Sequence, residues 1–154
     1  MFESIFIEIS NYLKVCELSE DRNIDKKCHN IFIKNLANNN MNVIGYVSQE
    51  EEKMEMFSNI NVNKDKPKYI IAFDPLDGSS NLSSNISTGS IYGIYEYDDN
   101  NNKLVKIVNS GYCIYGPKTV MVSTENDKVN LKILKNDKFI FEKNLSFEEI
   151  KNNK

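Results

Sequence analysis

The segment Tyr69–Asn81 reads YIIAFDPLDGSSN and is the most informative stretch of the chain. Its apolar first half predicts a buried β-strand that ends at an acidic residue, Asp74. Pro75 disfavours a helical conformation for the residue before it, and Asp77 adds a second carboxylate three residues after the first. Two carboxylates at the end of one strand can converge on a hard cation. The segment therefore predicts a cation site at this end of a strand.

The residues after the second carboxylate, Gly78 to Asn81, favour an anion site beside the cation site. Gly78 permits close approach of the backbone to a ligand, and serine and asparagine begin helices well. The N–H groups at the start of such a helix face an anion. Carboxylates beside an anion site are chemically sensible when a divalent metal joins them, which indicates a metal-dependent phosphate-ester hydrolase. Mg²⁺ would take oxygens from Asp74, Asp77 and the backbone carbonyl of Leu76.

An acidic segment, Gln49–Glu52, directly follows a predicted strand, Val43–Ser48. Two interpretations stay open for it. The carboxylates lie in a solvated loop, or Glu50 or Glu51 faces the Asp74 site and completes a two-metal clamp. In such a clamp one metal activates water and the other stabilises the leaving oxygen.

The composition predicts one globular, cytoplasmic domain. The chain has 154 residues, of which 40% are hydrophobic and 27% charged, and a net charge of -3 without a basic patch, so nucleic acid is not an expected partner. No run approaches the roughly 20 apolar residues of a membrane span, and Glu3 and Glu8 interrupt the early apolar residues, which argues against a signal peptide. Three cysteines without paired spacing indicate reduced thiols. The single histidine, His29, is expected to be an ordinary helix residue.

The order of elements predicts an α+β fold, a layered α/β sandwich whose N-terminal helices pack on a mixed, largely antiparallel sheet. Asp25 falls in the first turn of the second helix, where its carboxylate either favours the helix dipole or serves the metal site. Residues 104–115 fit either a helix or a strand, and residues 53–68 are irregular. The apolar periodicity predicts helices over 2–16 and 24–36, and strands over 43–48, 69–73, 89–97, 119–123, 129–134 and 139–142.

At Asp74–Asn81 the chain resembles the class 1 fructose-1,6-bisphosphatase family, whose most recognisable motif it matches without a substitution. Four further stretches resemble the family in the same order: Ile24-Asp25, Val47–Glu51, Thr88–Tyr95 and Gly111–Gly116. The resemblance implies the sugar-phosphatase fold. It also implies that residues 1–154 form a single partial phosphatase domain, the amino-terminal half of the family, without the C-terminal half that binds sugar phosphate.

The resemblance further implies Mg²⁺-dependent hydrolysis of the 1-phosphate of fructose 1,6-bisphosphate, in gluconeogenesis, with Mn²⁺ or Zn²⁺ as alternative metals. It implies a homo-oligomer or an assembly with a complementary chain. By the same resemblance, the catalytic residues are Glu50 and Asp25, the metal ligands are Asp74, Leu76, Asp77, Glu50 and Gln49, and the phosphate-binding residues are Asp77, Gly78, Ser79 and Ser80.

The chain departs from the family pattern in three ways that predict impaired activity in this short chain alone. Gln49 stands where the family has a metal-bridging glutamate, Asn30 stands where it has an acidic residue of the catalytic site, and the chain has about half the family's length. A non-catalytic remnant or regulatory subunit therefore stays open as an alternative. So does an enzyme similar to sedoheptulose bisphosphatase or to an inositol-phosphate phosphatase.

Overall fold

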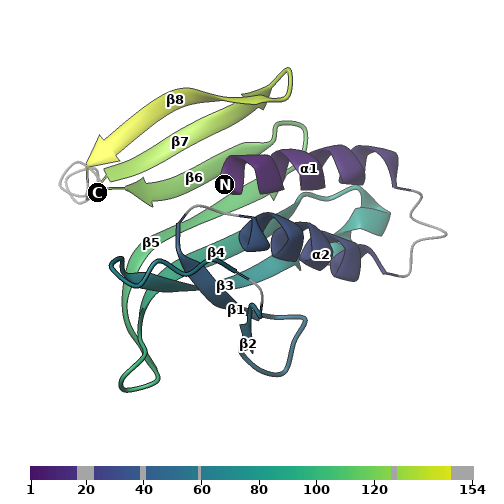
Figure 1. Cartoon of the computed structure of the whole chain (residues 1–154). Helices are drawn as coiled ribbons and strands as arrows, with labels where there is room; N and C mark the ends of the chain where they lie inside the picture. Colours follow the sequence, from purple (N-terminus) through teal and green to yellow (C-terminus); the bar gives the residue numbers. More distant parts are fainter. Residues whose placement is uncertain (17–22, 39–40, 59, 126–127, 147–154) are drawn as a thin grey trace.

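The structure is a computed structural model, and it describes residues 1–16, 23–38, 41–58, 60–125 and 128–146. Two α-helices lie together on one face of an eight-stranded sheet (Figure 1). This arrangement confirms the predicted α+β sandwich. In chain order the elements are α1 (Phe2–Val15), α2 (Ile24–Ala37), β1 (Val43–Ser48), β2 (Glu55–Met56), β3 (Lys68–Asp77), the 3-10 helix η1 (Ser79–Ser84), β4 (Thr88–Asp98), β5 (Lys103–Tyr115), β6 (Val120–Glu125), β7 (Lys128–Lys135) and β8 (Lys138–Ser146).

The sheet has the strand order β2-β1-β3-β4-β5-β6-β7-β8. Strands β1 and β3 pair in parallel, and the other neighbouring strands pair antiparallel. The sheet is therefore mixed and largely antiparallel, as the sequence predicts. Because β1 and β3 run in the same direction, their carboxyl ends meet at one edge of the sheet. The predicted acidic segment after β1 is thus brought to the predicted cation site on β3.

Three sequence predictions about the strands change in the structure. Residues 104–115, which fit a helix or a strand, belong to β5, because β5 pairs along most of its length with β4. The predicted strand 69–73 continues through the acidic residues to Asp77, with an irregularity in its pairing after Asp74. The irregular segment 53–68 contains the two-residue strand β2, which extends the edge of the sheet.

The core lies between the helices and the sheet and is rich in aromatic rings. Phe32 of α2 stacks on Phe73 of β3 with 4.3 Å between ring centroids. Phe2 of α1 stacks on Tyr92 of β4 at 3.5 Å. Phe32 is fully buried, and the end of β3 is therefore fixed against α2 by packed apolar surface.

The helix α1 is also tied to the last strands of the sheet by polar contacts. The hydroxyls of Ser10 and Thr119 lie 3.0 Å apart and are buried, and Lys132 of β7 donates to Glu3 at 2.6 Å. These contacts join residues more than a hundred positions apart in sequence. The first helix and the last strands are therefore parts of one packed unit.

The second face of the sheet carries exposed apolar side chains and is covered by no helix of the described residues (Figure 1). Neighbouring residues of a strand point to opposite faces, so Ile91 points away from the helix face on which Tyr92 packs. Ile91 pairs with Tyr112, which pairs in turn with Val122, and these residues form an apolar row across β4, β5 and β6. Ile91 is 54% exposed and Tyr112 is 41% exposed. We refer to this surface as the open face.

Candidate active site

The acidic motif of β3 lies in a bulge at the end of the strand. Asp74 pairs with Ile91 and Asp77 pairs with Gly89, so β3 has one residue more than β4 across this interval. Asp74 is partly buried, and its Oδ1 accepts a hydrogen bond from the backbone N–H of Leu76 at 3.1 Å. A bulge re-aims side chains and backbone groups at the edge of a sheet. This bulge contains the predicted metal ligands, which are the carboxylates of Asp74 and Asp77 and the backbone carbonyl of Leu76.

Glu50 is brought to this bulge by the parallel pairing of β1 and β3. The backbone N–H of Gln49 donates to the carbonyl of Phe73 at 3.1 Å and continues the pairing one residue past β1. Burial raises the pKa of Glu50, and the negative charges of Asp25 and Asp74 raise it further. Electrostatic interactions therefore link three predicted site residues: Asp25 of α2, Glu50 just after β1, and Asp74 of β3.

The pKa of Asp74 is raised in the same way. Burial is the largest cause, and the charges of Asp77 and Asp25 add to it, while the hydrogen bond from the Leu76 amide opposes the shift. Carboxylates that raise one another's pKa create a negative potential that a divalent cation relieves. The interpretation that part of the acidic segment faces Asp74 is thus supported for Glu50.

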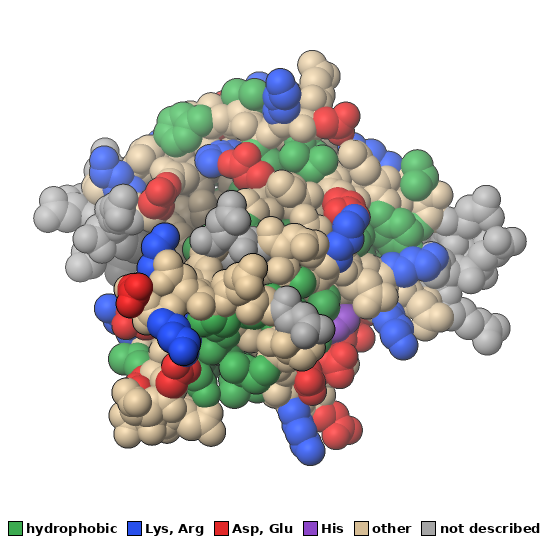
Figure 2. Space-filling model, in the orientation of Figure 1, with side chains coloured by type: hydrophobic (Ala, Val, Ile, Leu, Met, Phe, Trp, Pro, Cys, Tyr) green, Lys and Arg blue, Asp and Glu red, His purple; other side chains and the backbone are tan. Residues whose placement is uncertain are grey.

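His29 and Ser48 hold the acidic segment against α2, and the sequence did not indicate either residue. The buried Ser48 Oγ lies 2.9 Å from His29 Nδ1 and accepts a hydrogen bond from the Glu50 backbone N–H at 3.2 Å. His29 Nε2 lies 3.5 Å from a carboxylate oxygen of Glu51. Burial lowers the pKa of His29 even though Glu51 acts to raise it. Because Nε2 faces the Glu51 carboxylate, we place the proton of neutral His29 on Nε2, so that Nδ1 accepts from the Ser48 hydroxyl. Figure 2 shows acidic side chains beside the purple histidine.

His29 is thus a helix residue, as predicted, but with a specific contact to the site. One signal in the sequence does point to this contact. His29 follows Asp25 by four residues on the same helix, and residues with this spacing share one face.

The predicted phosphate-binding segment begins with a glycine in the left-handed conformation. Gly78 has φ 73°, which residues with a side chain adopt at a cost, and its carbonyl accepts from the Asn81 N–H at 2.9 Å. The predicted helix is the six-residue 3-10 helix η1. Ser79 is partly buried and Ser80 is exposed. The serine hydroxyls and the first backbone amides therefore lie directly after the carboxylates of β3.

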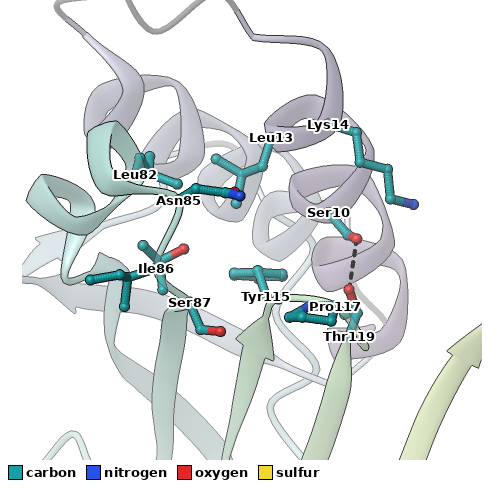
Figure 3. A pocket seen from close by; sticks show the side chains of 12 residues that line it. Ser10, Leu13, Lys14, Leu82, Asn85, Ile86, Ser87, Tyr115, Pro117 and Thr119 are labelled. Carbon is teal, nitrogen blue, oxygen red and sulfur yellow. Dashed lines mark hydrogen bonds between the residues drawn. The ribbon is translucent and has the colours of Figure 1, made fainter.

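A cavity of about 450 Å³ lies on the other side of η1, between the C-terminal half of α1 and the turn from β5 to β6 (Figure 3). Leu82 and Ile86 form one wall, and the hydrogen-bonded pair Ser10 and Thr119 lies opposite (Figure 3). None of the predicted metal ligands lines it. The cavity is therefore separate from the acidic site.

The donor set of the acidic site fits Mg²⁺. Within the described part of the chain, no three Asp, Glu, His or Cys side chains form a group that by itself could hold a metal ion. Mg²⁺ does not require such a cage, because it binds through one or two carboxylates, waters and substrate phosphate oxygens. Asp74, Asp77, Glu50 and the Leu76 carbonyl supply only oxygens, and the charges of neighbouring carboxylates add to burial in raising the pKa of Asp74 and of Glu50.

The two residues that depart from the family pattern have uncharged side chains. Gln49 is exposed at the end of β1, and Asn30 is exposed on α2. Asp25 is partly buried on the same helix.

No helix within the described residues is long and apolar enough to cross a membrane.

The fold and the acidic site together define the N-terminal part of a sugar-phosphatase fold. Residues 16–144 match the family model described as "Fructose-1-6-bisphosphatase, N-terminal domain". The chain belongs to the fructose-1,6-bisphosphatase family. The resemblance stated from the motif Asp74–Asn81 is therefore confirmed.

Similar proteins agree with this assignment. The chain is 32% identical to a cytosolic fructose-1,6-bisphosphatase of Solanum tuberosum over 119 residues, which cover 72% of this chain and 34% of the relative. It is 40% identical to a class 1 fructose-1,6-bisphosphatase of Helicobacter hepaticus over 93 residues, which cover 60% of this chain and 31% of the relative.

Solved structures give the same result for the fold. The holo form of fructose-1,6-bisphosphatase from Leishmania major superposes with a TM-score of 0.75 at 27% identity, covering 92% of this chain and 47% of that one. The T-state structure of the same enzyme gives a TM-score of 0.74 at 26% identity. The chain thus spans about half the length of these solved relatives and about a third of the curated ones.

Proposed function

We propose that this chain is the metal-binding part of a Mg²⁺-dependent sugar-bisphosphate phosphatase that removes the 1-phosphate of fructose 1,6-bisphosphate. The observation that carries the proposal is the parallel pairing of β1 with β3, which brings Glu50 within electrostatic range of Asp74 and Asp25, directly before the Gly78 turn. Bound Mg²⁺ would neutralise these carboxylates and polarise a phosphoryl oxygen. Mn²⁺ or Zn²⁺ would suit the same oxygen and carboxylate ligands less specifically.

In this proposal one group of residues binds the metal and another binds the phosphate. Asp74, Asp77 and the Leu76 carbonyl would hold the metal, and Glu50 and the amide oxygen of Gln49 would supply further oxygens. Ser79, Ser80 and the backbone amides after Gly78 bind the phosphoryl oxygens, as donors fixed in advance where negative charge develops.

Glu50 is the proposed general base. The family resemblance assigns it this role, and its carboxylate can accept a proton from water. A water oxygen attacks phosphorus, its proton passes to the Glu50 carboxylate, and the bond from phosphorus to the sugar oxygen breaks. The sugar oxygen takes a proton from solvent, and inorganic phosphate leaves. Asp25 keeps the Glu50 carboxylate basic through its nearby charge.

We also propose that a segment equivalent to the remaining half of the solved relatives covers the open face. The chain spans 47% of the solved holo relative, so a comparable length of chain has no counterpart here. The open face exposes an apolar row that a soluble monomer rarely leaves uncovered. An amphipathic layer of that segment would bury this row and bring the groups that bind the rest of the sugar bisphosphate.

A non-catalytic role is the second candidate, and two residues favour it. Gln49 and Asn30 are neutral where the family pattern is acidic, so less negative charge is available to hold two dications. Such a chain would bind a partner through the open face without turning over substrate.

Phosphate release from fructose 1,6-bisphosphate with Mg²⁺ tests the proposal, for the chain alone and mixed with the C-terminal half of the Helicobacter hepaticus relative. We expect activity in the mixture, its loss in Asp77→Asn, and an increase in Gln49→Glu. Ile91→Lys should abolish co-elution of the two halves. Co-elution without phosphate release in any variant would support the non-catalytic role instead.

A further inference from the structure

The peptide unit between Pro75 and Leu76 lies in the middle of the β3 bulge. Proline has no N–H to offer to the neighbouring strand, and Pro75 is fully buried, so its carbonyl needs a partner from elsewhere. Opposite it, the two residues of β4 that pair across the bulge are Gly89 and Ile91, and Ser90 lies between them.

Ser90 supplies the missing partner. Its hydroxyl donates to the Pro75 carbonyl at 2.7 Å, and its side chain is 1% exposed. On the other side of the same peptide unit, the Leu76 N–H donates to Asp74 Oδ1 at 3.1 Å. Both polar groups of this peptide unit are therefore fixed, which limits its rotation in the bulge.

Tyr115 of β5 in turn fixes the hydroxyl of Ser90. The two oxygens lie 2.8 Å apart. A carbonyl only accepts, so the Ser90 proton points to Pro75, and the Tyr115 hydroxyl donates to Ser90 Oγ. Burial holds the pKa of Tyr115 well above its ordinary value, so the donor stays protonated. Three strands thus contribute to one chain of hydrogen bonds that ends at the bulge.

We infer that Ser90 and Tyr115 are positioning residues that hold the Leu76 carbonyl and the Asp77 carboxylate in the orientation for binding a divalent cation. The carbonyl of Leu76 belongs to the peptide unit directly after the fixed one. Rotation of the backbone within the bulge would therefore turn the Leu76 carbonyl and the Asp77 carboxylate away from the cation. The inference rests on the proposed function of these two ligands. Groups that orient metal ligands commonly change metal affinity by about 10–100-fold when removed.

The test compares Ser90→Ala with a matched control, Ser10→Ala. Ser10 is also a buried serine, 3% exposed, whose hydroxyl bonds to Thr119 and not to Ser90, Tyr115 or a residue of the β3 bulge. Two quantities are measured on the full chain: the exchange rates of the Leu76 and Asp77 backbone amides by NMR without metal, and the dissociation constant for Mn²⁺ by calorimetry.

We expect Ser90→Ala to speed exchange of the Leu76 amide about tenfold or more and to weaken Mn²⁺ binding about 10–100-fold. Tyr115→Phe should give a smaller change in the same direction, because it leaves the Ser90 hydroxyl in place. Ser10→Ala should change neither quantity beyond its effect on global stability, which exchange at the Phe73 amide reports.

Wild-type exchange at Leu76 in Ser90→Ala, or the same change in Ser10→Ala, would overturn the inference. If the unmodified chain binds no Mn²⁺, the metal-site part of the proposed function fails. The claim that Ser90 and Tyr115 orient metal ligands then fails as well. Faster exchange in Ser90→Ala would then show a purely structural role. Bound Mn²⁺ with unchanged affinity in Ser90→Ala rejects the positioning role while the proposed function stands.

Discussion

Replacement of Asp74 by asparagine should have opposite effects on stability without and with metal. Burial and the charges of Asp77 and Asp25 raise the pKa of Asp74, so the ionised carboxylate is disfavoured in the folded chain. Asparagine removes that charge, and its side-chain oxygen still accepts the Leu76 N–H. We therefore expect Asp74→Asn to raise the free energy of unfolding by about 0.5–2 kcal/mol in EDTA. This corresponds to about 2–4 °C in Tm per kcal/mol.

The sign depends on pH and on the metal. A carboxylate with a raised pKa binds more protons in the folded state, so wild-type stability falls, and the advantage of the variant grows, as pH rises from about 4. The advantage is complete above the pKa of Asp74 in the folded chain. Saturating Mg²⁺ stabilises only a chain that binds it, by about 2.7 kcal/mol at a hundred times Kd, and should reverse the order of the two proteins.

Thermal unfolding by circular dichroism at pH 7, with EDTA and with excess Mg²⁺, measures both effects. Asp98→Asn is the matched control, because hydrogen bonds from the Asn101 side chain and the Asn100 backbone lower the pKa of the exposed Asp98. That variant should lose stability equally in both conditions. A lower Tm for Asp74→Asn in EDTA, or equal Mg²⁺ stabilisation of Asp74→Asn and wild type, would refute the reasoning.

Three further outcomes are expected. Unfolding of the wild-type chain should become easier as pH falls below about 6.5, because the lowered pKa of His29 favours its neutral form in the fold, and urea titrations of His29→Gln should show a flatter pH dependence. A thiol reagent at pH 8 should modify Cys16 in the folded chain but not Cys113, whose pKa burial raises to about 12, and denaturant should abolish the difference. Phe32→Ala should cost about 3–5 kcal/mol in urea unfolding, whereas a cost below 1 kcal/mol would contradict tight packing on Phe73.

The helix and strand order was predictable from periodicity, and the site's motif from local chemistry. Both depend on residues close together in sequence. Residues 104–115 were ambiguous, because alternation there is weak and pairing with β4 decides the strand. The electrostatic influence of Asp74 on Glu50 depends on the parallel pairing of β1 with β3, which no local pattern reports.

The residues that hold the site in place were the least predictable. Ser48 and Ser90 are ordinary strand serines in sequence, and their roles follow from the partners that the fold brings to them. Only the spacing of Asp25 and His29 on one helix face offered a local sign. The roles of all the predicted catalytic, metal-binding and phosphate-binding residues remain predictions.

The ties between α1 and the last strands have a consequence for synthesis of the chain. Helix α1 is synthesised before Thr119 and Lys132, which bond to its Ser10 and Glu3 and follow more than a hundred residues later. Contacts of such long sequence separation form slowly, because a long loop must close first. The polar ties of α1 to the last strands therefore form only after β6 and β7 have been made, whereas its apolar residue Phe2 can stack on Tyr92 as soon as β4 exists.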